Sequence, residues 1–219
     1  MKIVQLLEIV SILLGSGCGK DIDANDFVLR ANLAKLNGYM DDVGQRTSMM
    51  MINVGTVRKL HNVLTNHSTT GSKERADMLQ YLQSIQSVML LYAKETGRDT
   101  AKGLQQIATV LEEESIPVQF AFNLAFAIGP TKRRWQTNAY PSSGLIMLTV
   151  AETFCKNITL YGFYPYNKDS LGAPILHHSY QPNLTEFHTK AHNFDEEHRL
   201  LKNVSKKGFF GLVLKPCTP

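Results

Sequence analysis

The segment Pro141-Ser142-Ser143-Gly144 places two hydroxyl groups directly before an apolar stretch that is predicted to be a helix over residues 142–154. The first turn of a helix carries unpaired N–H groups and a partial positive charge, so hydroxyls at this position can help to bind an anion. Serine is also a favoured helix cap, and taken alone the segment is more typical of a plain N-cap. The two interpretations differ in whether Ser142, Ser143 and Gly144 face a ligand.

Five of the seven histidines lie toward the end of the chain: His177, His178, His188, His192 and His198. Imidazole titrates near neutral pH, so a positioned histidine can take a proton from a hydroxyl nucleophile. A single histidine is more often a surface or core residue, and the residue type alone assigns no role. Glu197 follows His192 with four residues between them, and a solvated helix carboxylate is an equally good explanation of it.

The composition is that of an ordinary globular domain, with 219 residues, of which 43% are hydrophobic and 19% charged. The formal net charge is +4, and basic residues are dense only at 132–134 and 206–207, which favours a solvated surface over nucleic-acid binding. No run approaches the roughly 20 apolar residues that span a bilayer. The apolar start, residues 1–14, contains Glu8 and has no small-residue cleavage site, so a buried first strand is favoured over a signal peptide.

Four Asn-x-Ser/Thr sequons favour the secretory pathway: Asn66, Asn157, Asn183 and Asn203. The three cysteines are Cys18, Cys155 and Cys217. In an oxidising compartment they can form one disulfide and leave one thiol, and their spacing fits no zinc motif.

Apolar runs alternate with helical patterns, which predicts an α/β domain with a mostly parallel sheet flanked by helices. The predicted strands cover residues 7–14, 26–31, 48–53, 88–92, 118–122, 158–163 and 209–214. The predicted helices cover residues 74–86, 99–113, 142–154 and 194–203. The segments 55–72 and 124–140 carry the weakest patterns, and 55–72 is predicted to be partly loop.

Two longer stretches contain several of these residues. The first is Leu14-Gly15-Ser16-Gly17-Cys18-Gly19-Lys20-Asp21-Ile22-Asp23, followed by Phe27-Val28-Leu29-Arg30-Ala31-Asn32-Leu33-Ala34. The second is Pro141-Ser142-Ser143-Gly144-Leu145, followed by Phe154-Cys155 and Tyr161-Gly162-Phe163-Tyr164-Pro165-Tyr166. Together they resemble the two long motifs of the animal sialyltransferases, closest to the alpha-2,8-linking branch, and the likeness runs from about residue 11 to 217.

The resemblance implies one Rossmann-like glycosyltransferase domain, a GT-A-like variant, over residues 1–219. It implies that sialic acid passes with inversion from CMP-sialic acid to a sialylated glycoprotein or glycolipid in the Golgi lumen. Neither a cofactor nor a metal is expected, although Asp21-Ile22-Asp23 has the Asp-x-Asp spacing with which other glycosyltransferases hold a cation. The basic stretch of polymerising members is weak here, which favours transfer of one or a few residues. The alternative is a catalytically inactive, truncated relative that only binds glycan or partner proteins.

The resemblance also implies roles for residues in the donor site. Asn32 and the segment 142–144 match donor contacts, although an Asn at a strand end can equally satisfy turn backbone groups. Tyr164 stands where this branch commonly has Trp, so its ring could stack on the cytidine or simply pack in the core.

For the transfer step, the resemblance implies that His192 is the general base and that Glu197 orients this motif. His178 matches the short third motif and would hydrogen-bond the leaving phosphate, with His177 as its rival.

The resemblance fails at the start of the first long motif. Ile9 aligns with a donor-binding Asn of the family and Val4 with a Cys, so the chain is expected to lack the anchor, the stem and the start of that motif. A hydrogen bond lost at Ile9 would cost roughly 1–3 kcal/mol if a polar partner stays unpaired. A Cys18–Cys217 disulfide is implied, and Cys155 has lost its family partner.

Overall fold

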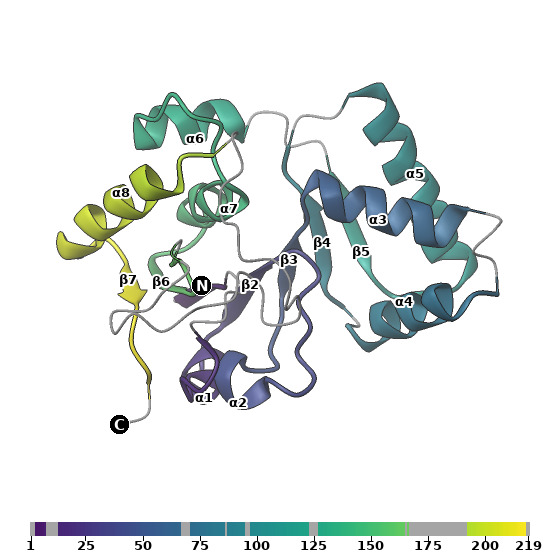
Figure 1. Ribbon diagram of the computed structural model, residues 1–219, viewed down its shortest axis with the longest axis horizontal. Coiled ribbons are helices and arrows are strands. Elements are labelled where there is room, and N and C mark those ends of the chain that lie inside the picture. The colour runs from purple at the N-terminus through teal and green to yellow at the C-terminus, as the bar shows by residue number, and fades with distance from the viewer. Residues whose placement is uncertain are drawn as a thin grey trace.

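The described part of the protein forms one seven-stranded sheet with helices on both of its faces (Figure 1). The computed structural model describes residues 3–7, 13–66, 71–85, 87–94, 97–122, 127–164, 166 and 192–217. The strands are β1 (Ile3–Leu7), β2 (Phe27–Ala31), β3 (Met49–Met51), β4 (Met89–Tyr92), β5 (Gln119–Phe122), β6 (Asn157–Tyr161) and β7 (Gly211–Val213). The helices are α1 (Gly19–Asp23), α2 (Met40–Val43), α3 (Val54–Thr65), α4 (Lys73–Ser84), α5 (Arg98–Glu113), α6 (Ile128–Trp135), α7 (Ser143–Glu152) and α8 (Phe194–Lys206).

The strands lie in the order β5-β4-β3-β2-β1-β6-β7, and all their pairings are parallel. Successive side chains on a strand point to opposite faces, so neighbouring residues enter different cores. On β3, Met50 packs with α3, α4 and α5, whereas Met51 packs with α6, α7 and α8. The small helices α1 and α2 cover a third cluster, around Ile22 and Val28.

Side-chain caps fix where several helices begin. Asn53, Ser72, Ser142 and Asn193 each accept a hydrogen bond from the backbone N–H three residues on. The composition of α7 differs from the others, because it is apolar on nearly every side and buried from Gly144 to Leu148. Such a helix suits a position between the sheet and the outer helices α6 and α8, which Figure 1 shows above β6 and β7.

Strands β2 to β5 are added on one side of β1, and β6 and β7 are added on its other side. The switch point of the sheet therefore lies between β1 and β6. In open parallel sheets, ligands bind beyond the carboxyl ends of the strands at such a point. Helices α7 and α8 lead directly into β6 and β7, so each runs back along the sheet and presents its N-terminus toward the carboxyl ends. The fold therefore places Ser142 and the start of α8 where a ligand site is expected.

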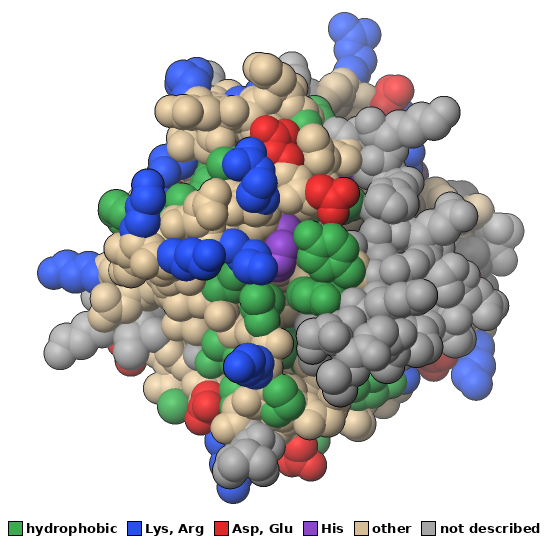
Figure 2. All heavy atoms as spheres, turned by 60° about the vertical axis from the view of Figure 1, so that its left-hand side comes forward, with side chains coloured by type: hydrophobic (Ala, Val, Ile, Leu, Met, Phe, Trp, Pro, Cys, Tyr) green, Lys and Arg blue, Asp and Glu red, His purple; other side chains and the backbone are tan. Residues whose placement is uncertain are grey.

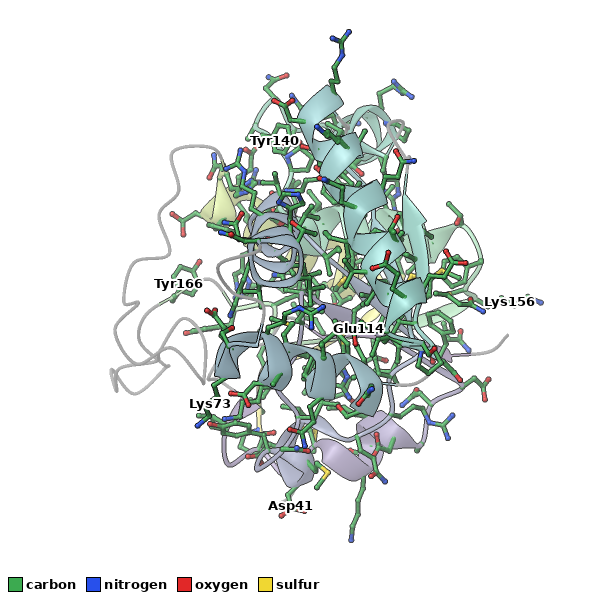
Figure 3. All side chains as sticks on the ribbon, turned by 90° about the vertical axis from the view of Figure 1, so that its right-hand side faces the viewer. Asp41, Lys73, Glu114, Tyr140, Lys156 and Tyr166 are labelled. Atoms are coloured by element: carbon green, nitrogen blue, oxygen red, sulfur yellow. A yellow bond between two sulfur atoms is a disulfide. The ribbon has the colours of Figure 1, made fainter. Side chains whose placement is uncertain are left out.

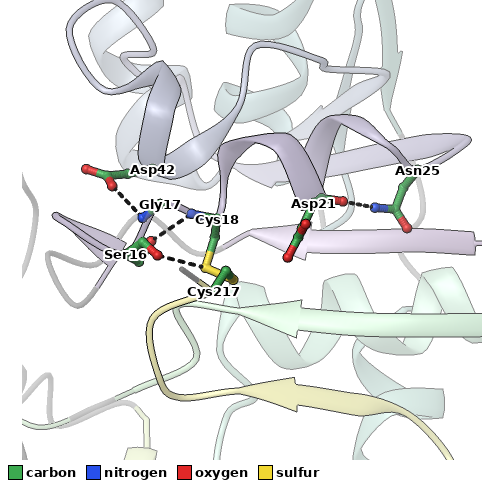
Figure 4. The surroundings of a disulfide bond; sticks show 7 residues. All are labelled: Ser16, Gly17, Cys18, Asp21, Asn25, Asp42 and Cys217. Atoms are coloured by element: carbon green, nitrogen blue, oxygen red, sulfur yellow. Dashed lines mark hydrogen bonds between the residues drawn. A yellow bond between two sulfur atoms is a disulfide. The ribbon is translucent and has the colours of Figure 1, made fainter. Parts of the chain in front are cut away.

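A disulfide between Cys18 and Cys217 joins residues that are 199 positions apart (Figure 4). The loop before Cys18 is held by Asp42, whose carboxylate accepts the N–H groups of Gly15 and Gly17 at 2.8 and 2.9 Å. The backbone N–H of Cys217 donates to the carbonyl of Ser16. The end of the chain is thus fixed to the segment that follows β1, and the predicted pairing is confirmed.

The predicted α/β class with a parallel sheet is confirmed, and most elements lie within two residues of their predicted ranges. The predicted strand 7–14 is wrong, because β1 ends at Leu7 and Leu13 lies in a short helical turn. The segments 55–72 and 124–140 contain helices α3 and α6, where partial loop was predicted for the first. Among the helices within the described residues, none has the length and hydropathy needed to cross a bilayer.

Candidate active site

Ser142 caps α7 and also connects it to α8. Its hydroxyl accepts the N–H of Leu145 at 3.1 Å, so the N-cap interpretation of this serine is correct. Its own backbone N–H donates to Oε1 of Glu197 at 2.8 Å. Ser143 is half-buried and Gly144 is buried in the first turn that follows. The capping geometry leaves open whether this turn also receives a ligand.

His192 lies just before α8 and contacts the segment that precedes α7. Its Nδ1 is 2.8 Å from the backbone carbonyl oxygen of Tyr140, and the two rings are 5.9 Å apart. A carbonyl oxygen only accepts, so Nδ1 carries the proton and the neutral ring has its lone pair on Nε2. Burial lowers the pKa of His192 below its ordinary value, and the nearby Lys94 lowers it further, against the opposing effect of the Tyr140 hydrogen bond. The ring therefore has the form that a general base requires.

Glu197 is 5% exposed, so it is a buried carboxylate and not the solvated one that was the alternative. Burial raises its pKa, and the hydrogen bonds from Ser142 act in the opposite direction. Lys94, two residues after β4, is close enough to lower the pKa of this carboxyl. Burial lowers the pKa of Lys94 itself, and the charge of Glu197 acts in the opposite direction. The ammonium Nζ of Lys94 lies 5.3 Å from the ring centroid of Tyr140.

A second group of rings follows β6. Tyr164 makes T-shaped contacts with Tyr166 at 5.1 Å and with His198 at 5.9 Å between centroids. His198 is held by a 3.1 Å hydrogen bond from Nδ1 to the carbonyl of Phe163. Tyr166 is exposed, and Figure 3 shows it on the opposite side of the molecule from Lys156. Tyr164 is therefore linked to α8 through His198.

Asn32 directly follows β2 with a φ of 56°, a left-handed conformation that Asn tolerates better than most residues. Its Oδ1 accepts the backbone N–H of Asn53 at 3.1 Å and the hydroxyl of Thr56 at 3.0 Å. The oxygen of Asn32 therefore satisfies a backbone N–H of the following loop, which was the alternative to a donor contact. The amide nitrogen makes no hydrogen bond to another described residue.

The structure brings Ser142, His192 and Glu197 into one cluster. Asn32 follows β2 and Tyr164 follows β6, so both lie at the carboxyl edge of the same sheet. His178, its rival His177 and Ile9 lie outside the described residues. Asp23 uses its carboxylate on the N–H groups of residues 45 and 46, which agrees with a turn-capping role.

Sequence analysis missed Lys94, Tyr140 and His198 as members of this region. One signal for Lys94 was present, since a charged residue directly after a buried parallel strand lies at the carboxyl edge of the sheet. Basic side chains also gather on the face formed by α6, α8 and β7 (Figure 2). The exposed basic residues of α6 are Arg133 and Arg134, and those of α8 and its C-cap are Arg199, Lys202, Lys206 and Lys207.

Comparisons with known proteins identify the family and the fold. The chain is 29% identical over 216 residues to an alpha-N-acetylneuraminide alpha-2,8-sialyltransferase of Xenopus laevis, which covers 94% of this chain and 56% of the relative. The chain therefore spans little more than half the length of that relative. Two crystal structures of a mammalian sialyltransferase superpose with TM-scores of 0.65 and 0.64 at 18% identity, over 98% of this chain and 70% of theirs. The second of them holds Gal-beta-1-3GalNAc-ortho-nitrophenol. Since the sequence model of glycosyltransferase family 29 matches residues 10–209, the chain belongs to the sialyltransferase family.

Proposed function

We propose that this chain is the catalytic domain of an alpha-2,8-sialyltransferase, which moves sialic acid from CMP-sialic acid to a sialylated glycan on a glycoprotein or glycolipid. The observation that carries the proposal is the cluster of His192, Ser142 and Glu197 at the N-terminus of α7 in a member of this family. The alpha-2,8 linkage is supported by the amphibian relative.

In the proposed reaction, an acceptor hydroxyl attacks the anomeric carbon of the donor from the face opposite CMP. The bond from that carbon to the phosphate oxygen breaks, its electron pair leaves with CMP, and the configuration inverts. The hydroxyl proton passes to Nε2 of His192, which the Tyr140 carbonyl keeps unprotonated in the neutral ring. In this proposal His178 stabilises the departing phosphate, and Glu197 orients the segment that carries His192.

The donor would lie across the carboxyl ends of the strands. The first turn of α7, with Ser143 and Gly144, offers N–H groups and a partial positive charge to the donor's anionic groups. Asn32 would donate from its amide nitrogen, because its oxygen is already bonded. Tyr164 would offer its ring to the cytidine at the end of β6.

The proposal requires no metal or other cofactor, since CMP leaves as a phosphate that cationic and hydrogen-bonding groups can stabilise. The Asp-x-Asp pair is used in part for the fold, because Asp23 holds the N–H groups of residues 45 and 46. We place the protein in the Golgi lumen, where the Cys18–Cys217 disulfide would persist. The exposure of Asn66, Asn157 and Asn203 in their sequons supports the same compartment.

The second candidate is a catalytically inactive relative that only binds glycan or partner proteins. It is favoured by Ile9 at the position of a donor-binding Asn and by Cys155, whose thiol is free in the structure. Such a protein could keep the fold and the acceptor surface without turning over the donor.

The deciding experiment is transfer of labelled sialic acid from CMP-sialic acid to a sialylated glycoprotein and to a ganglioside. Transfer that is lost in His192→Ala, while His61→Ala on α3 remains active, would establish the enzyme and its acceptor class. A folded wild-type chain that transfers nothing to either acceptor would refute the catalytic function and leave the binding role.

A further inference from the structure

Lys94 contributes a positive charge to the region of His192. It follows β4 by two residues, at the carboxyl edge of the sheet, and its side chain is half-buried. Its Nζ lies over the ring of Tyr140, and the backbone carbonyl of the same Tyr140 holds His192. One residue therefore links the ammonium group to the imidazole.

The ammonium group has no anionic partner among the described residues. The described residues form two ion pairs, Arg75–Glu114 and Arg134–Glu152, and neither involves Lys94. No described side chain or carbonyl accepts a hydrogen bond from Lys94. Glu197 is near enough to affect its pKa, but that carboxylate is committed to the N–H of Ser142. A half-buried cation that makes no ion pair or hydrogen bond with the described residues is costly unless an anion binds to it.

Resting on the proposed function, we propose that Lys94 binds the carboxylate of the acceptor's terminal sialic acid. This sugar carries both the anion and the hydroxyl that would attack the donor. His192 receives the proton of that hydroxyl, so the carboxylate of the same sugar must lie in the neighbourhood of His192, where Lys94 is. The Tyr140 ring fixes the direction of the ammonium group, which lowers the entropy lost on binding.

The donor also carries anions, its own carboxylate and its phosphate, and these are the other source of the same chemistry. In the proposed arrangement they face the first turn of α7 and Asn32. Lys94 is on the acceptor's side because it is coupled to the base. The proposal therefore commits Lys94 to selection of sialylated acceptors over neutral ones.

The experiment compares a sialylated trisaccharide acceptor with its methyl ester, in which the carboxylate is neutral, on the wild-type chain and on Lys94→Met. We expect the ester to raise the wild-type KM for the acceptor about tenfold to a hundredfold. In Lys94→Met the acid and the ester should have equal KM values, and the KM for CMP-sialic acid should stay unchanged. Lys94→Arg should restore much of the preference, and Lys156→Met, an exposed lysine in the loop before β6, should behave as wild type.

A Lys94→Met variant that changes only the KM for CMP-sialic acid, or neither KM, would overturn the proposal. A wild-type chain that does not distinguish acid from ester would overturn it as well, even if the variant fails to fold. If the wild-type chain transfers nothing, the proposed function fails, and calorimetric titration with the same acid and ester still decides the role of Lys94. Preferential binding of the acid that is lost in Lys94→Met would support the anion site in that case, and equal binding would refute it.

Discussion

The hydrogen bond between Glu197 and Ser142 joins α8 to α7 and gives the sharpest test of the site's construction. The carboxylate is buried, and its Oε1 accepts the Ser142 N–H at 2.8 Å. Two substitutions separate the two properties of this residue. Glu197→Leu removes the acceptor and the charge, whereas Glu197→Gln removes the charge and keeps an oxygen that can accept.

The leucine variant leaves the Ser142 N–H buried without a partner, which costs about 1–3 kcal/mol. For a chain of this size each kcal/mol lowers Tm by roughly 2–4 °C, so we expect a decrease of about 2–12 °C. The glutamine variant keeps the bond and no longer buries a charge. Its free energy of unfolding at pH 7 should therefore lie within about 1 kcal/mol of wild type.

The pH dependence has a definite sign. Burial raises the pKa of Glu197 above its ordinary value of 4.5, so the folded state binds this proton more tightly than the unfolded state. The stability that Glu197 contributes is therefore full below the unfolded pKa and is lost as the pH rises through the folded pKa. Relative to Glu197→Gln, the wild-type chain should lose stability as the pH rises from below 4.5 toward neutral.

Urea unfolding of the three proteins at acid and neutral pH measures these differences, with Glu113→Gln on the exposed face of α5 as the control. A leucine variant as stable as wild type would refute the inference that this bond stabilises the junction. A glutamine variant as unstable as the leucine variant would show that the charge, and not the acceptor, is what matters.

Four further predictions concern individual residues of the domain. If His192 is the base, kcat/KM should rise with pH through a midpoint below 6.5, because burial and then Lys94 lower its pKa; a midpoint well above 6.5 would argue against that role. Cys18→Ser should cost roughly 5 kcal/mol in the free energy of unfolding, since the disulfide closes a span of 199 residues, and an unchanged urea midpoint would contradict this. The Cys155 thiol should react only slowly with iodoacetamide at pH 7, because burial raises its pKa to about 11. Asn32→Asp keeps both accepted bonds but not the amide donor, so Tm should hold while the KM for CMP-sialic acid rises; an unchanged KM would remove Asn32 from the donor site.

Periodicity in the sequence was sufficient for the elements whose faces differ clearly. Helix α5 was predicted within one residue of its observed bounds, because Leu104, Ile107 and Leu111 recur on one buried side. Helix α3 was partly missed although Val57 and Leu60 show the same spacing. Its polar residues were interpreted as loop formers, but Asn53 caps the helix and the hydroxyl of Thr65 donates to a carbonyl one turn back.

The end of β1 shows a different limit. The residues from Leu7 to Leu14 are apolar apart from Glu8 and Ser11, so the pattern predicted a strand over 7–14, although Glu8 directly follows the last residue of β1. Leu7 makes the last pair of β1 with both β2 and β6, opposite Arg30 and Tyr161, and such pairing is a property of distant segments. A single sequence does not contain that information in its local pattern.

The candidate site, like the end of β1, depends on contacts between segments that are distant in the sequence. Family motifs indicated Ser142, His192 and Glu197 one by one, and the carboxylate was equally well explained as a solvated one. The fold brings these residues near Lys94 at the carboxyl edge of the sheet, and Lys94 belongs to none of those motifs. The site then has one cation without a described partner, one carboxylate committed to a backbone N–H, and one imidazole whose pKa burial lowers and whose Nδ1 is oriented by a carbonyl. We therefore expect this charge arrangement to bind an anionic acceptor better than a neutral one, so that acceptor choice depends on Lys94 more than on the residues proposed to bind the donor.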